Sequence, residues 1–182
     1  MKALSAVLAG SMTLLVFTTQ ASASVLKGKK PKNVFFTGKE TPGEMIEPGS
    51  TETVDDKIII RGNVQRAQDI TDDERVQGEL IIETNACLDP RTLWGPVWGT
   101  FVLANPGGKW LAAWIGQITA QGVTIFAMAY GSGWHEGLMA NWTYTRIGAD
   151  PQKPFNIQGF IVRSTQAEAL LAKTGPQLTR MN

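Results

Sequence analysis

All six tryptophans of this 182-residue chain lie between residues 94 and 142. They occur in apolar segments interrupted by glycine, such as 94–99, 110–114 and 133–137. Aromatic residues at two-residue intervals between glycine-containing turns are typical of antiparallel β-strands. Indole rings gathered on one sheet either fill the interior of a barrel or line a pocket. The window therefore predicts a β-structure and indicates where a ligand would bind.

The first 23 residues have the features of a secretory signal peptide. Lys2 precedes an uncharged, mostly apolar segment from 3 to 17, and Ala21-Ser22-Ala23 matches a small-residue cleavage site. The apolar segment is too short for a membrane-spanning helix. We expect cleavage after Ala23, a secreted or periplasmic protein, and no membrane span in the mature chain. The alternative is an uncleaved N-terminal anchor.

Charge and cysteine content narrow the possible partners. Removal of Lys2 with the signal peptide leaves 16 basic and 16 acidic residues, so the mature chain has no net charge. It therefore lacks the excess of positive charge that is typical of nucleic-acid-binding proteins. Cys87 is the only cysteine, so no intrachain disulfide can hold the fold. We interpret Cys87 as a small buried residue near a strand end. An interchain bridge and a nucleophile are the alternatives.

The mature chain divides into three parts. Residues 24–56 are rich in lysine, proline and glycine and predict a flexible N-terminal arm, in which the apolar patch 34–36 could dock as an extra strand. Residues 57–164 alternate apolar and polar positions between turn signals and predict a β-barrel domain. Residues 165–182 predict a short C-terminal helix, ended by Gly175-Pro176, and a tail.

The strand pattern predicts an all-β fold, an up-and-down antiparallel barrel of about eight strands with a short C-terminal helix. Seven strands fall within 57–164, separated by turns such as the polar stretch 69–75 and Asn105-Pro106-Gly107-Gly108, and the arm can supply an eighth. The segments 110–119 and 123–130 are apolar on both faces, whereas a secreted antiparallel sheet usually keeps one polar face. Something must cover the outer face, so we expect a homo-oligomer, either a trimer or a dimer.

The aromatic window supplies the candidate ligand-binding residues. One interpretation places all its rings in the barrel core, where small residues such as Gly99 and Ala112 make room for them. The other has some of the rings lining an apolar cavity for a small apolar or aromatic molecule. The candidates on this second interpretation are Trp110, Trp114, Tyr130, Trp134 and Trp142.

Signals for catalysis are weaker. His135 is the only histidine and is a candidate catalytic or ligand residue, with a plain loop residue as the alternative. Its neighbour Glu136 would point to the opposite face of a strand, so the two are no catalytic dyad by proximity. If the polar face of the strand 76–86 points inward, then Glu79, Glu83 and Asn85 become candidate acid–base groups with Asn63 and Gln65 opposite. A solvent-exposed outer face is the alternative. One histidine and one cysteine are too few ligands for zinc, so we expect neither a metal nor another cofactor.

Several short motifs resemble a known family. They are Gly62-Asn63-Val64-Gln65, Arg75-Val76-Gln77-Gly78-Glu79-Leu80, Gly95-Pro96-Val97-Trp98-Gly99-Thr100, Trp114-Ile115-Gly116-Gln117 and Tyr130-Gly131-Ser132-Gly133 with Glu136-Gly137-Leu138. Their order resembles the allene oxide cyclase-like barrel proteins, whose superfamily includes the plant dirigent proteins. The resemblance covers 57–163 and implies an eight-stranded, commonly trimeric barrel whose cavity steers cyclisation or radical coupling of apolar substrates. No catalytic residue of the family can be matched to a position here.

Three hypotheses about function follow. The first is a secreted or periplasmic barrel that binds an apolar or aromatic small molecule. The second is a cyclase or isomerase that confines a reactive intermediate by orientation in the cavity. The third is an envelope interaction or assembly protein that uses the apolar outer face. The direction of the Glu79 and Glu83 side chains and the presence of a cavity discriminate among them.

Overall fold

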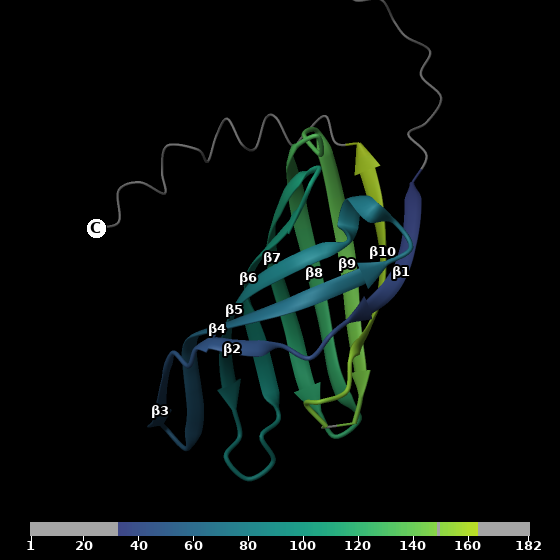
Figure 1. Ribbon diagram of the computed structural model, residues 1–182. Helices are drawn as coiled ribbons and strands as arrows, with labels where there is room; N and C mark the ends of the chain where they lie inside the picture. Colours follow the sequence, from purple (N-terminus) through teal and green to yellow (C-terminus); the bar gives the residue numbers. More distant parts are fainter. Residues whose placement is uncertain (1–32, 149, 164–182) are drawn as a thin grey trace, which may run out of the picture.

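The computed structural model describes residues 33–148 and 150–163, which form one antiparallel sheet of ten strands and a single turn of 3-10 helix. The elements in chain order are β1 (Val34–Glu40), β2 (Glu44–Glu47), β3 (Ser50–Val54), β4 (Lys57–Thr71), η1 (Glu74–Val76), β5 (Gly78–Leu88), β6 (Gly95–Asn105), β7 (Gly108–Thr119), β8 (Gly122–Gly133), β9 (Leu138–Ile147) and β10 (Phe155–Arg163). Figure 1 shows their arrangement. The predicted all-β, antiparallel fold is confirmed at this level.

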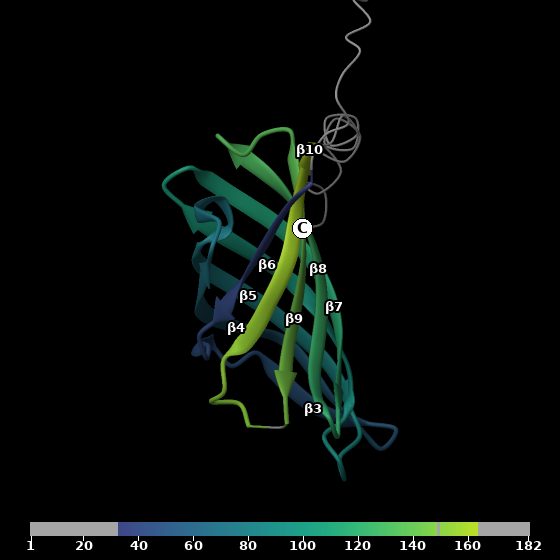
Figure 2. The same ribbon diagram turned by 90° about the vertical axis from the view of Figure 1, so that its right-hand side faces the viewer.

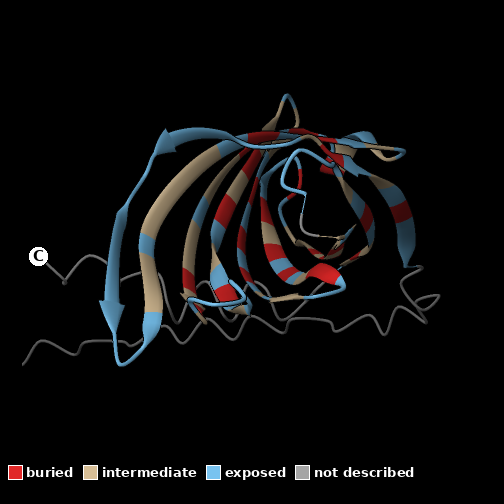
Figure 3. Cartoon of the chain, turned by 90° about the horizontal axis from the view of Figure 1, so that it is seen from below, coloured by how far each residue is buried: buried red, intermediate tan, exposed pale blue. Residues whose placement is uncertain are grey.

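The sheet closes on itself in a β-barrel-like ring. From β4 to β10 each strand pairs with the next in the chain, and β1 completes the ring by pairing with β10 on one side and with β4 on the other. The β1–β10 pairing covers the whole of β1, whereas the β1–β4 pairing has only the partners Gly38–Thr71, Lys39–Ile70 and Glu40–Asp69. Figure 3 looks into the ring from below, and Figure 2 shows β8, β9 and β10 side by side along one wall.

The segment predicted as a flexible arm is more ordered than its composition indicates. Its residues 34–54 contain three strands. The apolar patch 34–36 begins β1 and pairs with β10, which agrees with the stated possibility that this patch docks as an extra strand. The edge of β4 pairs in succession with β1, β2 and β3. β2 and β3 extend beyond the ring with all their residues exposed (Figures 1 and 3). Backbone pairing with β4 orders this polar segment without a core of its own.

β4 is longer than the sequence pattern predicts. The polar stretch 69–75 was expected to turn the chain, but β4 continues to Thr71 and the turn is confined to the residues around η1. Asp69 therefore lies in a strand, fully buried. An irregularity between Ile60 and Asn63, with Gly62 at a φ of +66°, lets β4 follow the curvature of the ring.

Large and small side chains alternate around the interior. One row of cross-strand partners runs around the ring through Asn63, Thr84, Gly99, Trp114, Ala127, Trp142, Gly159 and Phe36. A Cβ at Gly159 would collide with the Phe36 ring, and one at Gly99 would lie 3.0 Å from Cζ2 of Trp114. The small residues thus make room for the rings, as predicted for a narrow barrel. Edge-to-face contacts join Trp142 to Phe36, Phe101 and Trp110.

One end of the ring is plugged. Val76 from η1 is fully buried, and Nε1 of Trp110 donates a hydrogen bond to the Arg75 carbonyl at 2.6 Å. The His135 ring stacks on Trp110 with centroids 5.1 Å apart, and its Nε2 lies 3.0 Å from Oδ1 of Asn105. These residues come from β6, β7, η1 and the β8–β9 connection, so side chains from four segments fill this end of the ring.

Two predictions concern segments outside this fold. The C-terminal helix and tail at 165–182 and the signal peptide at 1–23 lie outside the described residues. Within 33–148 and 150–163, no helix has the length and apolar character needed to cross a bilayer.

Candidate functional site

The end of the ring opposite η1 contains a cavity of about 310 Å³. This volume lies at the lower end of the range of about 300–1,000 Å³ that is typical of small-molecule sites. Its wall comes from the first residues of β6, β8 and β10, the last residues of β1, β7 and β9, and the middle of β4 and β5. The loop residues Pro42, Gly43, Pro151 and Gln152 lie at its mouth. The cavity is thus the unfilled part of the ring interior.

The wall is divided into an apolar and a polar side. β6, β7 and β8 contribute the apolar side, which consists of Val97, Phe101, Trp114, Ile118, Val123 and Ile125. β1, β4, β5 and β9 contribute the polar groups, which are Glu40, Asn63, Gln65, Thr84, Tyr144 and Arg146, and β4 and β5 also contribute the apolar Ile60 and Ile82. A mostly apolar pocket with a few convergent polar groups is the usual form of a small-molecule site.

A buried acid pair lies beside the cavity at the seam between β1 and β4. Glu40 and Asp69 are cross-strand partners, exposed by 9% and 0%. The Tyr144 hydroxyl donates a hydrogen bond of 3.0 Å to Oδ2 of Asp69, and Oδ1 of Asp69 has no partner among the described residues. Burial raises the pKa of Glu40 to about 7, although the Arg146 charge opposes the rise. Burial and the Glu40 charge raise the pKa of Asp69 well above its usual value.

Arg146 stands at the mouth of the cavity. Its guanidinium carbon lies 4.5 Å from the centroid of the Phe155 ring, and Nη1 donates a hydrogen bond of 3.4 Å to the Pro151 carbonyl. Burial lowers the Arg146 pKa, while Glu40 and Asp150 oppose this effect. Among the described residues no carboxylate lies within ion-pair distance of Arg146. Its charge acts on Glu40 across space and not through a direct contact.

The five predicted ligand-binding residues are not brought together. Trp114 lines the cavity, and its Nε1 is buried without a partner among the described residues. Trp110 and Trp142 are fully buried, Trp110 at the plugged end and Trp142 in the core next to it. Tyr130 lies on the outward face of β8, and Trp134 in the β8–β9 connection is 88% exposed. The aromatic window thus places one of the five residues at the cavity.

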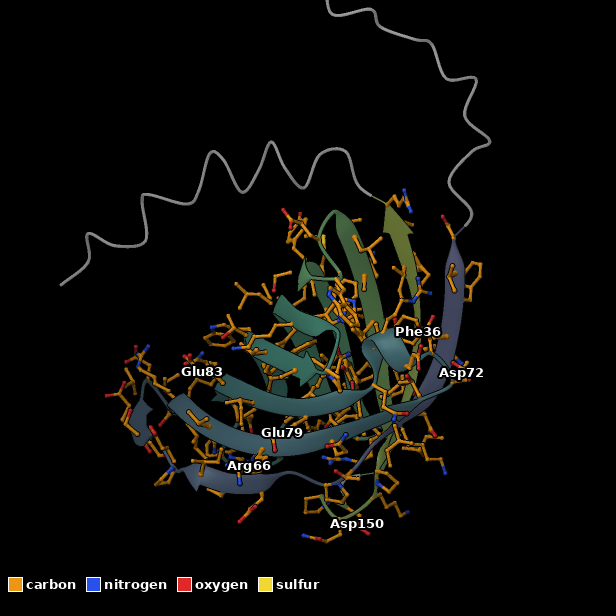
Figure 4. All side chains as sticks on the ribbon, turned by 45° about the horizontal axis from the view of Figure 1, so that its top comes forward. Phe36, Arg66, Asp72, Glu79, Glu83 and Asp150 are labelled. Atoms are coloured by element: carbon orange, nitrogen blue, oxygen red, sulfur yellow. The ribbon has the colours of Figure 1, made fainter. Side chains whose placement is uncertain are left out.

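The four weak catalytic candidates also lie away from the cavity. Glu79 and Glu83 are on the outer, exposed face of β5, and Glu79 faces Arg66 at 3.7 Å (Figure 4). Asn85 shares that face and accepts a hydrogen bond of 3.1 Å from the Gly62 amide, which supports the irregularity in β4. His135 belongs to the plugged end, where burial and the Arg75 charge lower its pKa. Cys87 is half-buried on the same outward-facing side of β5 as Asn85.

The groups that do line the site came from segments interpreted as arm and turn. Glu40 lies within the predicted arm and Asp69 within the predicted turn. A signal for them existed in the alternation of Asn63, Gln65, Ala67 and Asp69 along one face of β4, and of Trp142, Tyr144 and Arg146 along one face of β9. Within the described ranges, no cluster of three or more His, Cys, Asp or Glu side chains has an arrangement that could hold a metal ion.

The outer face of the aromatic strands is apolar, as the sequence indicates. Leu111 and Ile115 on β7 and Phe126 and Met128 on β8 are exposed by 62%, 67%, 56% and 45%. Ile115 and Phe126 are cross-strand partners, so the four side chains form one patch on adjacent strands. A contiguous apolar patch of this kind is typical of an interaction surface.

The fold and cavity define a β-barrel-like, all-β protein with an interior cavity. Comparison of the chain with protein-family models, with curated proteins and with solved structures found no match in any of the three.

Proposed function

We propose that this protein is a small β-barrel that binds an apolar or aromatic small molecule in the cavity at its open end. The observation that supports the proposal is the cavity itself, with its apolar side on β6–β8 and its polar groups on the opposite side. A solid interior would have favoured the third hypothesis, in which only the outer face has a function. A preformed apolar pocket lowers the cost of binding because little of the protein has to be reordered.

A cavity-filling substitution tests this proposal. Val97→Phe places a larger side chain in the cavity wall, whereas Val102→Phe on the same strand points outward and serves as the matched control. Binding can be followed by the change in tryptophan fluorescence, to which Trp114 in the cavity wall contributes, across a panel of lipids, aromatic compounds and terpenoid-sized hydrocarbons. We expect binding to be lost in Val97→Phe and kept in Val102→Phe. Equal binding by the two variants, or no response from any ligand class, would count against the proposal.

A second candidate function is a cyclase or isomerase acting on an apolar substrate in the same cavity. The acid pair favours it, because Glu40 has a pKa near the working pH and lies beside the apolar wall. In this function Glu40 takes a proton from one carbon of the substrate and returns it to another, while the cavity restricts the geometry. The original candidates Glu79 and Glu83 do not support the reaction, because both face away from the cavity.

Hydrogen–deuterium exchange discriminates the enzyme from the binding protein. An apolar cyclic ketone in D₂O exchanges the protons on the carbons next to its carbonyl when a general base abstracts them. We expect catalysed exchange in the wild type and none in Glu40→Gln, with Glu83→Gln unchanged because Glu83 is outside the cavity. Exchange at the buffer rate in the wild type would leave binding as the better supported function.

Location and assembly are part of the same proposal. We propose export to the periplasm or the exterior, on the signal-peptide features of residues 1–23, and a trimer or dimer formed through the outer patch of Leu111, Ile115, Phe126 and Met128. The resemblance to the allene oxide cyclase-like and dirigent barrels rests on the sequence motifs alone. N-terminal sequencing of the exported protein tests the first of these points.

A further inference from the structure

The charged side chains of the cavity wall, Glu40 and Arg146, form no ion pair with each other. Glu40 and Arg146 line the cavity, and Asp69 lies directly behind Glu40 as its cross-strand partner. These are two carboxyl groups and one guanidinium. On β10 the cross-strand partner of Glu40 is the uncharged Phe155, and on β9 burial, the Asp69 charge and the Glu40 charge raise the pKa of the Tyr144 hydroxyl. Because burial and the Glu40 charge raise the pKa of Asp69 well above its usual value, Asp69 favours its neutral form, and Arg146 is then the opposite charge nearest to an ionised Glu40.

Arg146 does not supply the missing contact. Its guanidinium is held at the mouth by the Phe155 ring and the Pro151 carbonyl, and Asp150 outside the mouth also attracts it. No hydrogen bond or ion pair to the Glu40 carboxyl occurs among residues 33–148 and 150–163, although this side chain is more than nine-tenths buried. A buried carboxylate is normally paired. The Glu40 carboxyl therefore faces the cavity as an unused acceptor.

We propose that the cavity selects apolar molecules that carry a protonated amine, with the ammonium group against Glu40 and the apolar body against β6–β8. The inference rests on the proposed function, since it names the class of molecule that the cavity binds. An ammonium group offers three donors and one positive charge, which suit a buried carboxyl that lines the cavity without a direct partner among the described residues. The wall formed by Val97, Ile118 and Ile125 takes the hydrocarbon part.

Protonation of Glu40 is the competing way to remove the unpaired charge. Burial raises its pKa to about 7, so near neutral pH the two forms are similar in population and a bound cation can displace the proton. The binding of an amine should therefore release protons and should weaken as the pH falls below 7. An anionic ligand would have to be bound by Arg146, whose Nη1 already donates to the Pro151 carbonyl and whose Nε is the donor without a partner among the described residues.

Three probes with one hydrocarbon cage test the inference: 1-adamantylamine, 1-adamantanol and 1-adamantanecarboxylate. Calorimetry at pH 8 on the full mature chain is expected to show the amine binding at least about tenfold more tightly than the alcohol, the size of one charge-assisted hydrogen bond. Glu40→Gln should remove this preference while keeping the alcohol affinity. Glu83→Gln carries the same charge change on the outer face and should leave the preference intact.

Two further measurements on the wild type keep the test independent of the variant's folding. In the first, the affinity for the amine should decrease by up to about tenfold for each pH unit below pH 7, while the affinity for the alcohol stays the same. In the second, the measured heat of amine binding should depend on the ionisation enthalpy of the buffer, because binding releases protons. Equal binding of amine and alcohol, with no effect of Glu40→Gln, overturns the inference and leaves the proposed function standing. Tightest binding of the carboxylate also overturns it. If none of the three cages binds, both proposals fail.

Discussion

Glu40 and Asp69 face each other across the short pairing of β1 with β4, and both side chains point into the ring. The ring of strands is thus closed at a point where two acids meet in a buried environment. Two carboxylates in such a position disfavour the ionisation of each other, and burial disfavours the ionisation of both. The same two residues therefore lie where β1 and β4 close the ring and are the acids whose ionisation changes the charge of the site.

The stability of the protein should depend on pH through Glu40. Its pKa is raised from 4.5 to about 7 in the folded state, so the protonated side chain favours folding. This stabilisation is fully present below the unfolded-state pKa and is lost as the pH rises to about 7, because the folded state then has to ionise a buried group. The shift corresponds to a loss of up to about 3 kcal/mol.

Urea denaturation between pH 4.5 and 8 measures this effect. Glu40→Gln keeps the shape of the neutral side chain, so we expect a flatter stability profile and a gain of about 1–3 kcal/mol over the wild type at pH 8. Glu83→Gln on the exposed face of β5 is the control and should follow the wild-type profile. Parallel profiles for Glu40→Gln and the wild type would show that Glu40 ionises without cost.

The strands of the aromatic window were predictable because their alternation is strong and their turns contain glycine. The sequence pattern predicted that Trp110, Ala112 and Trp114 share one face of a strand, and the structure buries all three. β2 and β3 in the predicted arm were missed because they bury little apolar surface, whereas the strand at 34–36 was one of the stated alternatives. Their order comes from backbone pairing with β4, which a local composition does not reveal.

The site was less predictable than the fold because it depends on closure. Glu40 and Asp69 are 29 positions apart in the sequence and meet only when β1 pairs with β4. Each has ordinary polar neighbours, so neither segment shows a local signature of a buried acid. Which face of a strand points inward also required the closed ring, and this decided against Glu79 and Glu83.

Tyr144 should stabilise the fold through its hydrogen bond to Asp69. Tyr144→Phe removes the hydroxyl donor and leaves the Oδ2 atom of a fully buried side chain unpaired. The expected loss is about 1–3 kcal/mol in the free energy of unfolding, measured by urea denaturation at pH 7. Tyr130→Phe, on the outward face of β8, should change stability by less than about 0.5 kcal/mol. A cost for Tyr144→Phe no greater than for Tyr130→Phe would mean that the hydrogen bond adds nothing.

The plugged end should depend on the indole nitrogen of Trp110. Trp110→Phe removes the 2.6 Å hydrogen bond to the Arg75 carbonyl and part of the surface on which His135 stacks. Trp142→Phe is a matched control, because Trp142 is equally buried but its Nε1 has no partner among the described residues. Thermal unfolding should show Trp110→Phe to be the less stable variant by about 1 kcal/mol. The reverse order would contradict a structural role for this hydrogen bond.

The outer patch on β7 and β8 should carry the contact between copies of the chain. Phe126 is 56% exposed next to its cross-strand partner Ile115, so Phe126→Lys adds a charge to the patch without disturbing the core. We expect multi-angle light scattering to give a dimer or trimer mass for the wild type and a monomer mass for Phe126→Lys. Gln158→Lys, on the outward face of β10, is the control for an added surface lysine and should keep the wild-type mass. A wild type at monomer mass would contradict the prediction, because burial of this apolar surface is the driving force for association.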